Sequence, residues 1–117
     1  MVTPAYSVRE HFANCAPVVE AIYERMLNAA KKLGAVREEA KKTSIHLVRK
    51  SAFAGVATRK NALILTLKSD SDLTSRRIIK REQVSANRWH LEVRLQSPDE
   101  VDRELVAWLK KAYELAA

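Results

Sequence analysis

The sequence predicts an α+β fold, a two-layer sandwich in which a mainly antiparallel sheet of about four or five strands packs against an N-terminal and a C-terminal helix. Two segments, one towards each end, repeat apolar residues at helical spacing, and the residues between them alternate apolar and polar at every second position. The connections between the predicted strands are short, which favours antiparallel pairing. With 117 residues, the chain is expected to form one domain over residues 1–117.

The first helix is predicted from about residue 16 to 33. Pro17 suits its first turn, where a missing N–H costs nothing, and Gly34 suits the position just past its end. One apolar stripe follows the helical period: Val18, Val19, Ile22, Met26, Leu27, Ala30 and Leu33.

The second helix is predicted from about residue 98 to 115. Ser97 is expected to cap it, Pro98 to occupy its first position and Glu100 to complete a capping box. Its apolar stripe consists of Val101, Leu105, Trp108, Leu109 and Ala112.

Strands are predicted wherever apolar residues recur with a period of two. In residues 88–96, Trp89, Leu91, Val93 and Leu95 share one face, and in residues 62–68 Leu63, Leu65 and Leu67 do the same. Ile45 and Leu47 share a face of an earlier strand, and residues 53–56 follow as the next strand after a turn. Gly55 predicts a bulge or a close backbone approach, and residues 58–61 (TRKN) predict a hairpin loop.

Residues 70–87 are the hardest to interpret. The run RRIIKREQV, residues 76–84, fits an edge strand or a short helix, and we favour the strand. Because both helices pack on one side, the other face of the sheet is expected to be uncovered. That open face is expected to carry His46, Thr66, Lys68, His90, Glu92 and Arg94.

The order of these motifs resembles a known family. A helix that ends in Gly, a basic strand that runs into FAGV, then RK and an apolar strand, form one half of the resemblance. The other half is NRWHLEVRLQSPDEVDRELVAWLKKAYE, and together they resemble, over residues 6–115, a small bacterial domain of unknown function. That family occurs alone or as a C-terminal module of larger proteins, some described as predicted transport proteins or linked to restriction-type systems. More remotely, the layout is similar to YdhG-like and YjbR-like domains, which implies a frataxin-like sandwich and no defined function.

Positive charge is concentrated in one window. The formal net charge is +7, and residues 41–69 contain seven Lys and Arg and no acid. Our leading hypothesis is therefore a non-enzymatic binding module whose basic surface engages nucleic acid backbone or an acidic protein region; the alternative is a solvated face that only aids solubility. Two pairs flank the FAGV strand and are expected at one end or edge of the sheet, and a second cluster follows. The candidates are Arg49, Lys50, Arg59, Lys60, Arg76, Arg77, Lys80 and Arg81.

The open face suggests a second hypothesis, a small-molecule or metal-binding protein. Its candidate residues are His46, Lys68, His90 and Arg94. Two imidazoles on one face can share a metal, with Glu92 as a further ligand, although we favour partly exposed strand residues and predict no metal site. A third hypothesis is an oligomerisation or accessory domain, suggested by Val48 and Ile64 on the outer face.

Enzyme activity is not supported by the sequence. Cys15 lies near the start of the first helix with His11 four residues earlier, but structural packing of this cysteine is the favoured interpretation. The sequence contains no G-x-S-x-G, HExxH or phosphate-cradling motif, so no cofactor is predicted. It also lacks an apolar run of the roughly 20 residues that a membrane span needs. A cytoplasmic location with no membrane partner is expected, and the oligomeric state is left open.

Overall fold

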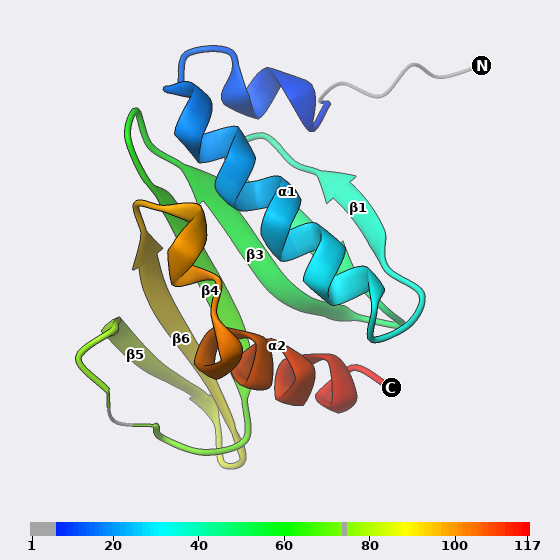
Figure 1. The fold of residues 1–117 in the computed structure, drawn as a ribbon. Coiled ribbons are helices and arrows are strands. Elements are labelled where there is room, and N and C mark those ends of the chain that lie inside the picture. Colours follow the sequence, from blue (N-terminus) through cyan, green and yellow to red (C-terminus); the bar gives the residue numbers. More distant parts are fainter. Residues whose placement is uncertain (1–6, 74) are drawn as a thin grey trace.

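The computed structural model describes residues 7–73 and 75–117 (Figure 1). Two α-helices are α1 (Pro17–Lys31) and α2 (Arg103–Leu115), and two short 3-10 helices are η1 (Arg9–Phe12) and η2 (Pro98–Glu100). The strands are β1 (Arg37–Ala40), β2 (Ile45–Val48), β3 (Ala52–Thr58), β4 (Leu63–Ser69), β5 (Ile78–Ser85) and β6 (Arg88–Leu95).

The six strands form one sheet in the order β1-β2-β3-β4-β6-β5, and every neighbouring pair is antiparallel. The predicted α+β class and antiparallel pairing are confirmed, but the predicted number of four or five strands is wrong. The strand that sequence reasoning missed is β1, whose sequence is REEA. Four mostly charged residues at a sheet edge bury little apolar surface, so the alternation that marks other strands is missing there.

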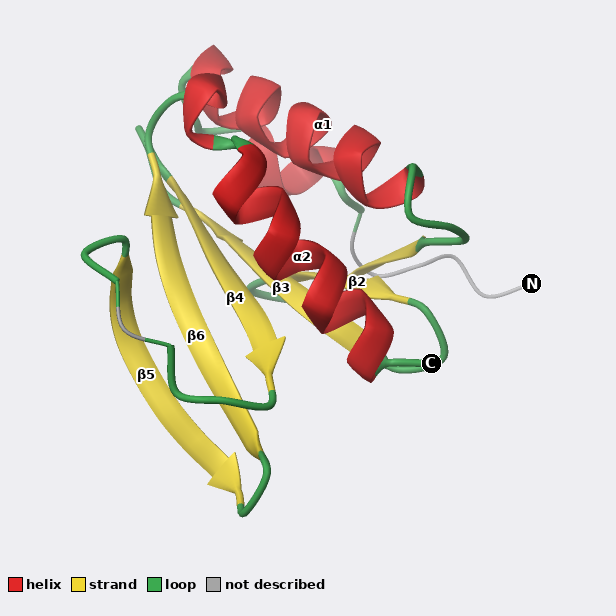
Figure 2. Cartoon of the chain, turned by 60° about the horizontal axis from the view of Figure 1, so that its bottom comes forward, coloured by secondary structure: helices red, strands yellow, loops and turns green. Residues whose placement is uncertain are grey.

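Both helices lie on the same face of the sheet, as Figure 2 shows. The core between them is built from the apolar stripes of α1 and α2 and from the alternate residues of β2, β3, β4 and β6. Its largest fully buried side chains include Ile22, Met26, Ile45, Leu47, Phe53, Leu63, Leu65, Leu67, Leu91, Leu95, Leu105 and Leu109. The opposite face of the sheet is not covered by a helix of the described residues.

The start of the second helix differs from the prediction. The Ser97 hydroxyl accepts a hydrogen bond from the Asp99 N–H, which caps only the 3-10 turn η2. The chain then leaves the helical conformation at Val101, whose side chain is buried in the core. Helix α2 therefore begins at Arg103, and its cap is the Asp102 carboxylate, which accepts from the backbone N–H of Leu105 at 3.1 Å.

The predicted capping box is also wrong, because the Glu100 carboxylate binds a different backbone N–H from the one expected. The Glu100 carboxylate accepts from the backbone N–H of Gln96 at 2.7 Å rather than from that of Ser97. Helix α1 is close to its predicted span, ending at Lys31 instead of residue 33.

A β-bulge in the β2–β3 pair lies at Phe53 rather than at Gly55. Leu47 pairs with Ala54 and Val48 pairs with Ala52, so Phe53 is the extra residue. Its ring is buried and packs edge-on against Tyr113 of α2, with 5.2 Å between ring centroids. Gly55 itself is in regular register, opposite His46 on β2 and Thr66 on β4.

The run 76–84 forms a strand, as favoured, and it is an edge strand. Most of β5 is exposed because it extends past the area that the helices cover (Figure 2). Arg77 holds the beginning of β5 to α2: its guanidinium donates to the carboxylates of Asp102 at 2.8 Å and Glu104 at 3.2 Å and lies over the Trp108 ring.

Candidate functional site

The strand register places the predicted open-face residues on one side of the sheet. His46, Gly55, Thr66 and Glu92 form one row across β2, β3, β4 and β6. In the next rows, Lys68 is opposite His90 and Ile64 is opposite Arg94. Since directly opposed residues of an antiparallel pair face the same way, the predicted face is confirmed.

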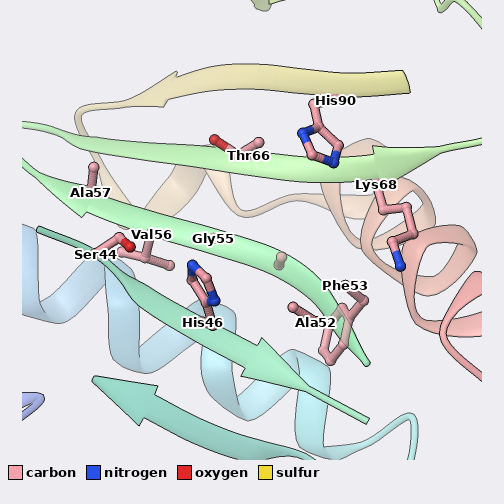
Figure 3. A pocket seen from close by; sticks show the side chains of 11 residues that line it. Ser44, His46, Ala52, Phe53, Gly55, Val56, Ala57, Thr66, Lys68 and His90 are labelled. Atoms are coloured by element: carbon pink, nitrogen blue, oxygen red, sulfur yellow. The ribbon is translucent and has the colours of Figure 1, made fainter. Parts of the chain in front are cut away.

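The open face is hollowed at its centre. A pocket of about 280 Å³ runs along β3, with residues 52–57 of that strand as its floor. Figure 3 shows the side chains that surround it, from Ser44 and Ala57 at one end to Ala52 and Lys68 at the other. Its polar lining consists of Ser44, His46, Thr66, Lys68 and His90.

The hollow exists because Gly55 contributes no side chain at the centre of β3. His46 and Thr66 stand on either side of it, on the neighbouring strands (Figure 3). A Cβ atom at Gly55 would lie 3.8 Å from the Cβ of Thr66 and 4.0 Å from Cδ2 of His46, both ordinary van der Waals distances. The missing side chain is therefore a gap that the fold could fill without strain.

The polar groups around the hollow are available for a ligand. Among the described residues, no hydrogen bond from another protein group engages the imidazoles of His46 and His90 or the hydroxyl of Thr66. The ammonium of Lys68 donates only a long hydrogen bond, 3.4 Å, to Ser51 Oγ. None of the eleven lining residues is acidic, so the hollow combines one fixed cation with imidazole and hydroxyl groups and favours negative charge.

The two histidines lie on opposite sides of this hollow. Three inter-strand spacings of ~4.8 Å separate β2 from β6, about 14 Å between Cα atoms in one row, and His90 lies a further two residues along. This distance is too long for one metal ion to bind both imidazoles. Within residues 7–73 and 75–117, no group of three or more His, Cys, Asp or Glu side chains is placed to hold a metal ion.

Three of the four predicted ligand-face residues line the hollow: His46, Lys68 and His90. Arg94 is on the same face but outside the lining, since it pairs with Ile64 at the far end of β4. Sequence reasoning missed Ser44 and the role of Gly55. The signal that points to Gly55 is a glycine at the centre of an otherwise apolar strand, which was interpreted as a bulge or a close backbone approach.

The basic pairs that flank β3 do not share one end of the sheet, contrary to expectation. Arg49 and Lys50 lie in the turn that precedes β3, whereas Arg59 and Lys60 lie in the turn that follows it. A seven-residue strand is about 20 Å long, so the two pairs are at opposite ends. The expectation failed because a strand separates the turns at its ends by its full length.

The Arg49 side chain is engaged by another residue of the protein, Tyr113. Its guanidinium lies over the Tyr113 ring, 4.3 Å from the centroid, and donates to the Tyr113 carbonyl at 3.2 Å. This geometry satisfies the cation through a ring face and a backbone acceptor. Lys50, Arg59 and Lys60 are exposed.

The second basic cluster is largely engaged in ion pairs. Arg77 contacts Asp102 and Glu104, Arg81 contacts Asp72 at 3.0 Å, and the Lys80 ammonium lies 3.8 Å from the Glu92 carboxylate. Arg76 is exposed in the loop that precedes β5. Binding of phosphates by the eight predicted cations stays a prediction, and five of them have partners within the chain: Arg49, Arg59, Arg77, Lys80 and Arg81.

Cys15 is in a packed position with a partner of its own. Its thiol donates to the His11 carbonyl at 3.4 Å, and its side chain packs against the core. The His11 imidazole does not contact the thiol; its Nε2 lies 2.8 Å from the Lys41 carbonyl. This arrangement is the one expected for a structural cysteine.

The apolar outer-face residues that suggested oligomerisation are buried. Val48 is 5% exposed and Ile64 is 8% exposed, so they provide no exposed apolar patch. The exposed large apolar side chains of the described residues are Ile79 and Val84 on β5. Within these residues, no helix is long and apolar enough to cross a bilayer.

The fold and the hollow define an α+β protein with one helix-covered sheet face and one open face that carries a cationic pocket. Comparison with protein families shows that the chain belongs to a family described as a domain of unknown function (DUF5655), whose model matches residues 8–116. Searches of the curated proteins and of the solved structures found no match. The remoter relation to YdhG-like and YjbR-like domains stays a prediction.

Proposed function

We propose that the chain binds an anionic small molecule in the hollow on its open sheet face. The observation that carries this proposal is the composition of the lining: the Lys68 ammonium, the imidazoles of His46 and His90, and no carboxylate. A charged hydrogen bond from an ammonium to a carboxylate or phosphate is stronger than one between neutral groups. A ligand anion therefore has a favourable partner in Lys68 and no repulsive one in the lining.

The size of the hollow favours a small molecule. Its volume of about 280 Å³ is at the lower end of the range of ligand pockets. The ligand would lie along β3 and accept hydrogen bonds from Thr66 or Ser44 as well as from the Lys68 ammonium.

The same geometry supports a small ligand better than a polyanion. Nucleic acid backbone is bound through several cations that neutralise successive phosphates. Here, the Arg49 guanidinium is engaged by Tyr113, and three residues of the second cluster are engaged by acids. A backbone-binding surface that used these four cations would have to displace these contacts, whereas the Lys68 ammonium has only its long contact with Ser51.

Amide NMR titration with inorganic phosphate and with acetate tests the proposal. We expect shifts at Gly55, Thr66 and His90, and we expect Lys68→Met to weaken binding about tenfold because it removes a charged hydrogen bond. Lys111→Met is the matched control. Lys111 is exposed on α2, and the substitution removes the same charge from the far side of the sheet, so it should leave the affinity within about twofold.

Two results would overturn the proposal. One is the absence of shifts around Gly55 with either anion up to about 10 mM, which covers millimolar dissociation constants. The other is an equal loss of affinity in the Lys68 and Lys111 variants, which would show that only net charge matters. Duplex DNA that binds the wild type and fails to bind an Arg59→Ala/Lys60→Ala variant, while the anions leave Gly55 unshifted, would instead support the nucleic-acid hypothesis.

A further inference from the structure

Gly55 is not required by the fold. Its φ is not in the left-handed region, unlike that of Gly34, and a Cβ there would meet its neighbours at ordinary distances. Glycine in a strand interior costs stability because it lacks a side chain to pack and has a more flexible unfolded state. The backbone conformation does not require a glycine at position 55. We therefore explain this glycine by the empty space that it leaves at the floor of the pocket.

That space has the shape of a slot. One wall is the imidazole of His46 and the other is the side chain of Thr66, while the floor is the Gly55 backbone (Figure 3). A Cβ at Gly55 would lie 3.8 Å from the Cβ of Thr66 and 4.0 Å from Cδ2 of His46, so these two wall atoms are at most about 8 Å apart. A flat ring fits a slot of this width on its edge, with one face towards the imidazole and the other towards Thr66, and offset stacking of this kind is a geometry that aromatic groups favour.

Charge in the hollow is not symmetric along β3. The ammonium of Lys68 and the imidazole of His90 are opposite each other at one end, and Ser44 and Ala57 occupy the other end. Lys68 is two residues beyond Thr66 on the same face, which is about 7 Å along the strand. A ligand that occupies both positions must carry its negative group about this far from its ring.

We propose that the ligand is an aromatic or heteroaromatic compound that bears a carboxylate or phosphate on a short linker. Its ring lies over Gly55 between His46 and Thr66, and its anionic group binds the Lys68 ammonium beside His90. This inference rests on the proposed function and adds to it the chemical class of the ligand and its direction along β3.

Three probes separate the ring from the charge. 3-Phenylpropionate carries both groups, propionate carries only the acid, and 3-phenylpropan-1-ol carries only the ring. We expect 3-phenylpropionate to bind the wild type at least about tenfold more tightly than either of the others. 2-Phenylethyl phosphate, which keeps a short linker, in place of 3-phenylpropionate decides whether a phosphate is preferred to a carboxylate.

Two variants test where the ring and the anionic group of the ligand bind. Gly55→Val fills the slot and should weaken 3-phenylpropionate about tenfold while leaving propionate within about twofold. Lys68→Met should weaken both acids. Gly55→Ala provides a second variant for the case in which valine perturbs the strand, because its Cβ is accommodated at ordinary distances; far-ultraviolet circular dichroism of each variant reports the fold.

Equal affinity for propionate and 3-phenylpropionate, or no effect of Gly55→Val and Gly55→Ala on the latter, would overturn this inference and leave the proposed anion site standing. Failure of every anion to shift the resonances around Gly55 would overturn both. Tighter binding of the neutral alcohol than of 3-phenylpropionate would contradict the assigned role of Lys68.

Discussion

The Tyr113 hydroxyl, near the end of α2, donates a hydrogen bond to the carbonyl of Ala35 at 3.0 Å, across 78 positions of sequence. Ala35 follows Gly34 in the segment between α1 and β1. The same ring packs against Phe53 and carries the Arg49 guanidinium on its face. Tyr113 therefore joins three segments that are distant in the sequence: the end of α1, the β2–β3 turn and α2.

Gly34→Ala should destabilise the protein strongly. Gly34 has φ +152°, which L side chains rarely adopt, and an added Cβ would overlap the Tyr113 hydroxyl. We expect a loss of about 1–3 kcal/mol in the free energy of unfolding, measured by urea denaturation. Gly55→Ala is the matched control and should change the same quantity by less than about 1 kcal/mol. Similar losses in the two variants would contradict the distinction drawn between the two glycines.

Arg49→Ala should lower stability, whereas Arg59→Ala should not. Arg49 loses a cation–π contact and a hydrogen bond to a backbone carbonyl, and we expect a cost of about 1–2 kcal/mol. Arg59 is exposed and bonds only the carbonyl of Thr58 beside it, so its removal should stay within about 0.5 kcal/mol. Thermal unfolding of both variants measures the difference, and equal midpoints would show that Arg49 is no more engaged than Arg59.

Tyr23 should make the protein sensitive to high pH. Burial of its phenol, followed by the hydrogen bond to the Glu38 carboxylate at 2.5 Å, raises the pKa of Tyr23 above its ordinary value of 10.0. The folded state therefore keeps a proton that the unfolded state releases. The resulting stability is complete below pH 10.0 and falls as the pH rises above it, by up to about 1.4 kcal/mol per pH unit.

Unfolding free energies between pH 8 and 11 test this prediction in the wild type and in Tyr23→Phe. The variant should be less stable at neutral pH by about 1 kcal/mol, because Glu38 loses its donor. It should also show a shallower decline above pH 10.0. A parallel decline in both proteins would assign the alkaline sensitivity to other groups.

Asp102 should contribute to the loss of stability in acid. The backbone N–H of Leu105 and then the Arg77 guanidinium hold the pKa of the Asp102 carboxyl below its ordinary value of 3.8. Its stabilising effect is therefore complete above pH 3.8 and is lost as the pH falls through the lowered pKa. Asp102→Ala should cost about 1 kcal/mol at neutral pH, the usual value of a helix N-cap. Asp102→Asn should retain part of the cap and lose stability less steeply between pH 5 and 2 than the wild type does.

The sequence predicted the parts of the fold in which burial has a period. Trp89, Leu91, Val93 and Leu95 alternate because β6 has one face in the core, and the stripe of α1 was found for the same reason. Prediction from the sequence failed at β1, which is short and charged. It also failed at the start of α2, where two possible capping residues, Ser97 and Asp102, are five positions apart. The choice between those caps depends on the burial of Val101, a tertiary contact that local sequence does not specify.

For the candidate site, the sequence predicted which residues lie on the open face of the sheet but not the hollow in that face. The alternation of β4 and β6 placed Lys68 and His90 on the open side, but their position opposite each other follows from the β4–β6 register, which no local pattern gives. The hollow depends on Gly55 lying between His46 and Thr66, two residues from other strands. The basic pairs show the same limit, since residues 49–50 and 59–60 are close in sequence and distant in the fold.

The position of β5 outside the helical layer has a consequence for how the sheet opens. Seven of its eight residues are exposed, so separating β5 from β6 uncovers little apolar surface, whereas β4 lies at the centre of the core. Local opening free energies follow the apolar surface that an opening exposes. Amide hydrogens of β5 should therefore exchange with solvent well before those of β4, and protection should rise stepwise from β5 through β6 to β4. The protein then has a stable core around β4 and an edge strand, β5, that can open separately. The contacts of Arg77 with Asp102 and Glu104 connect the two parts.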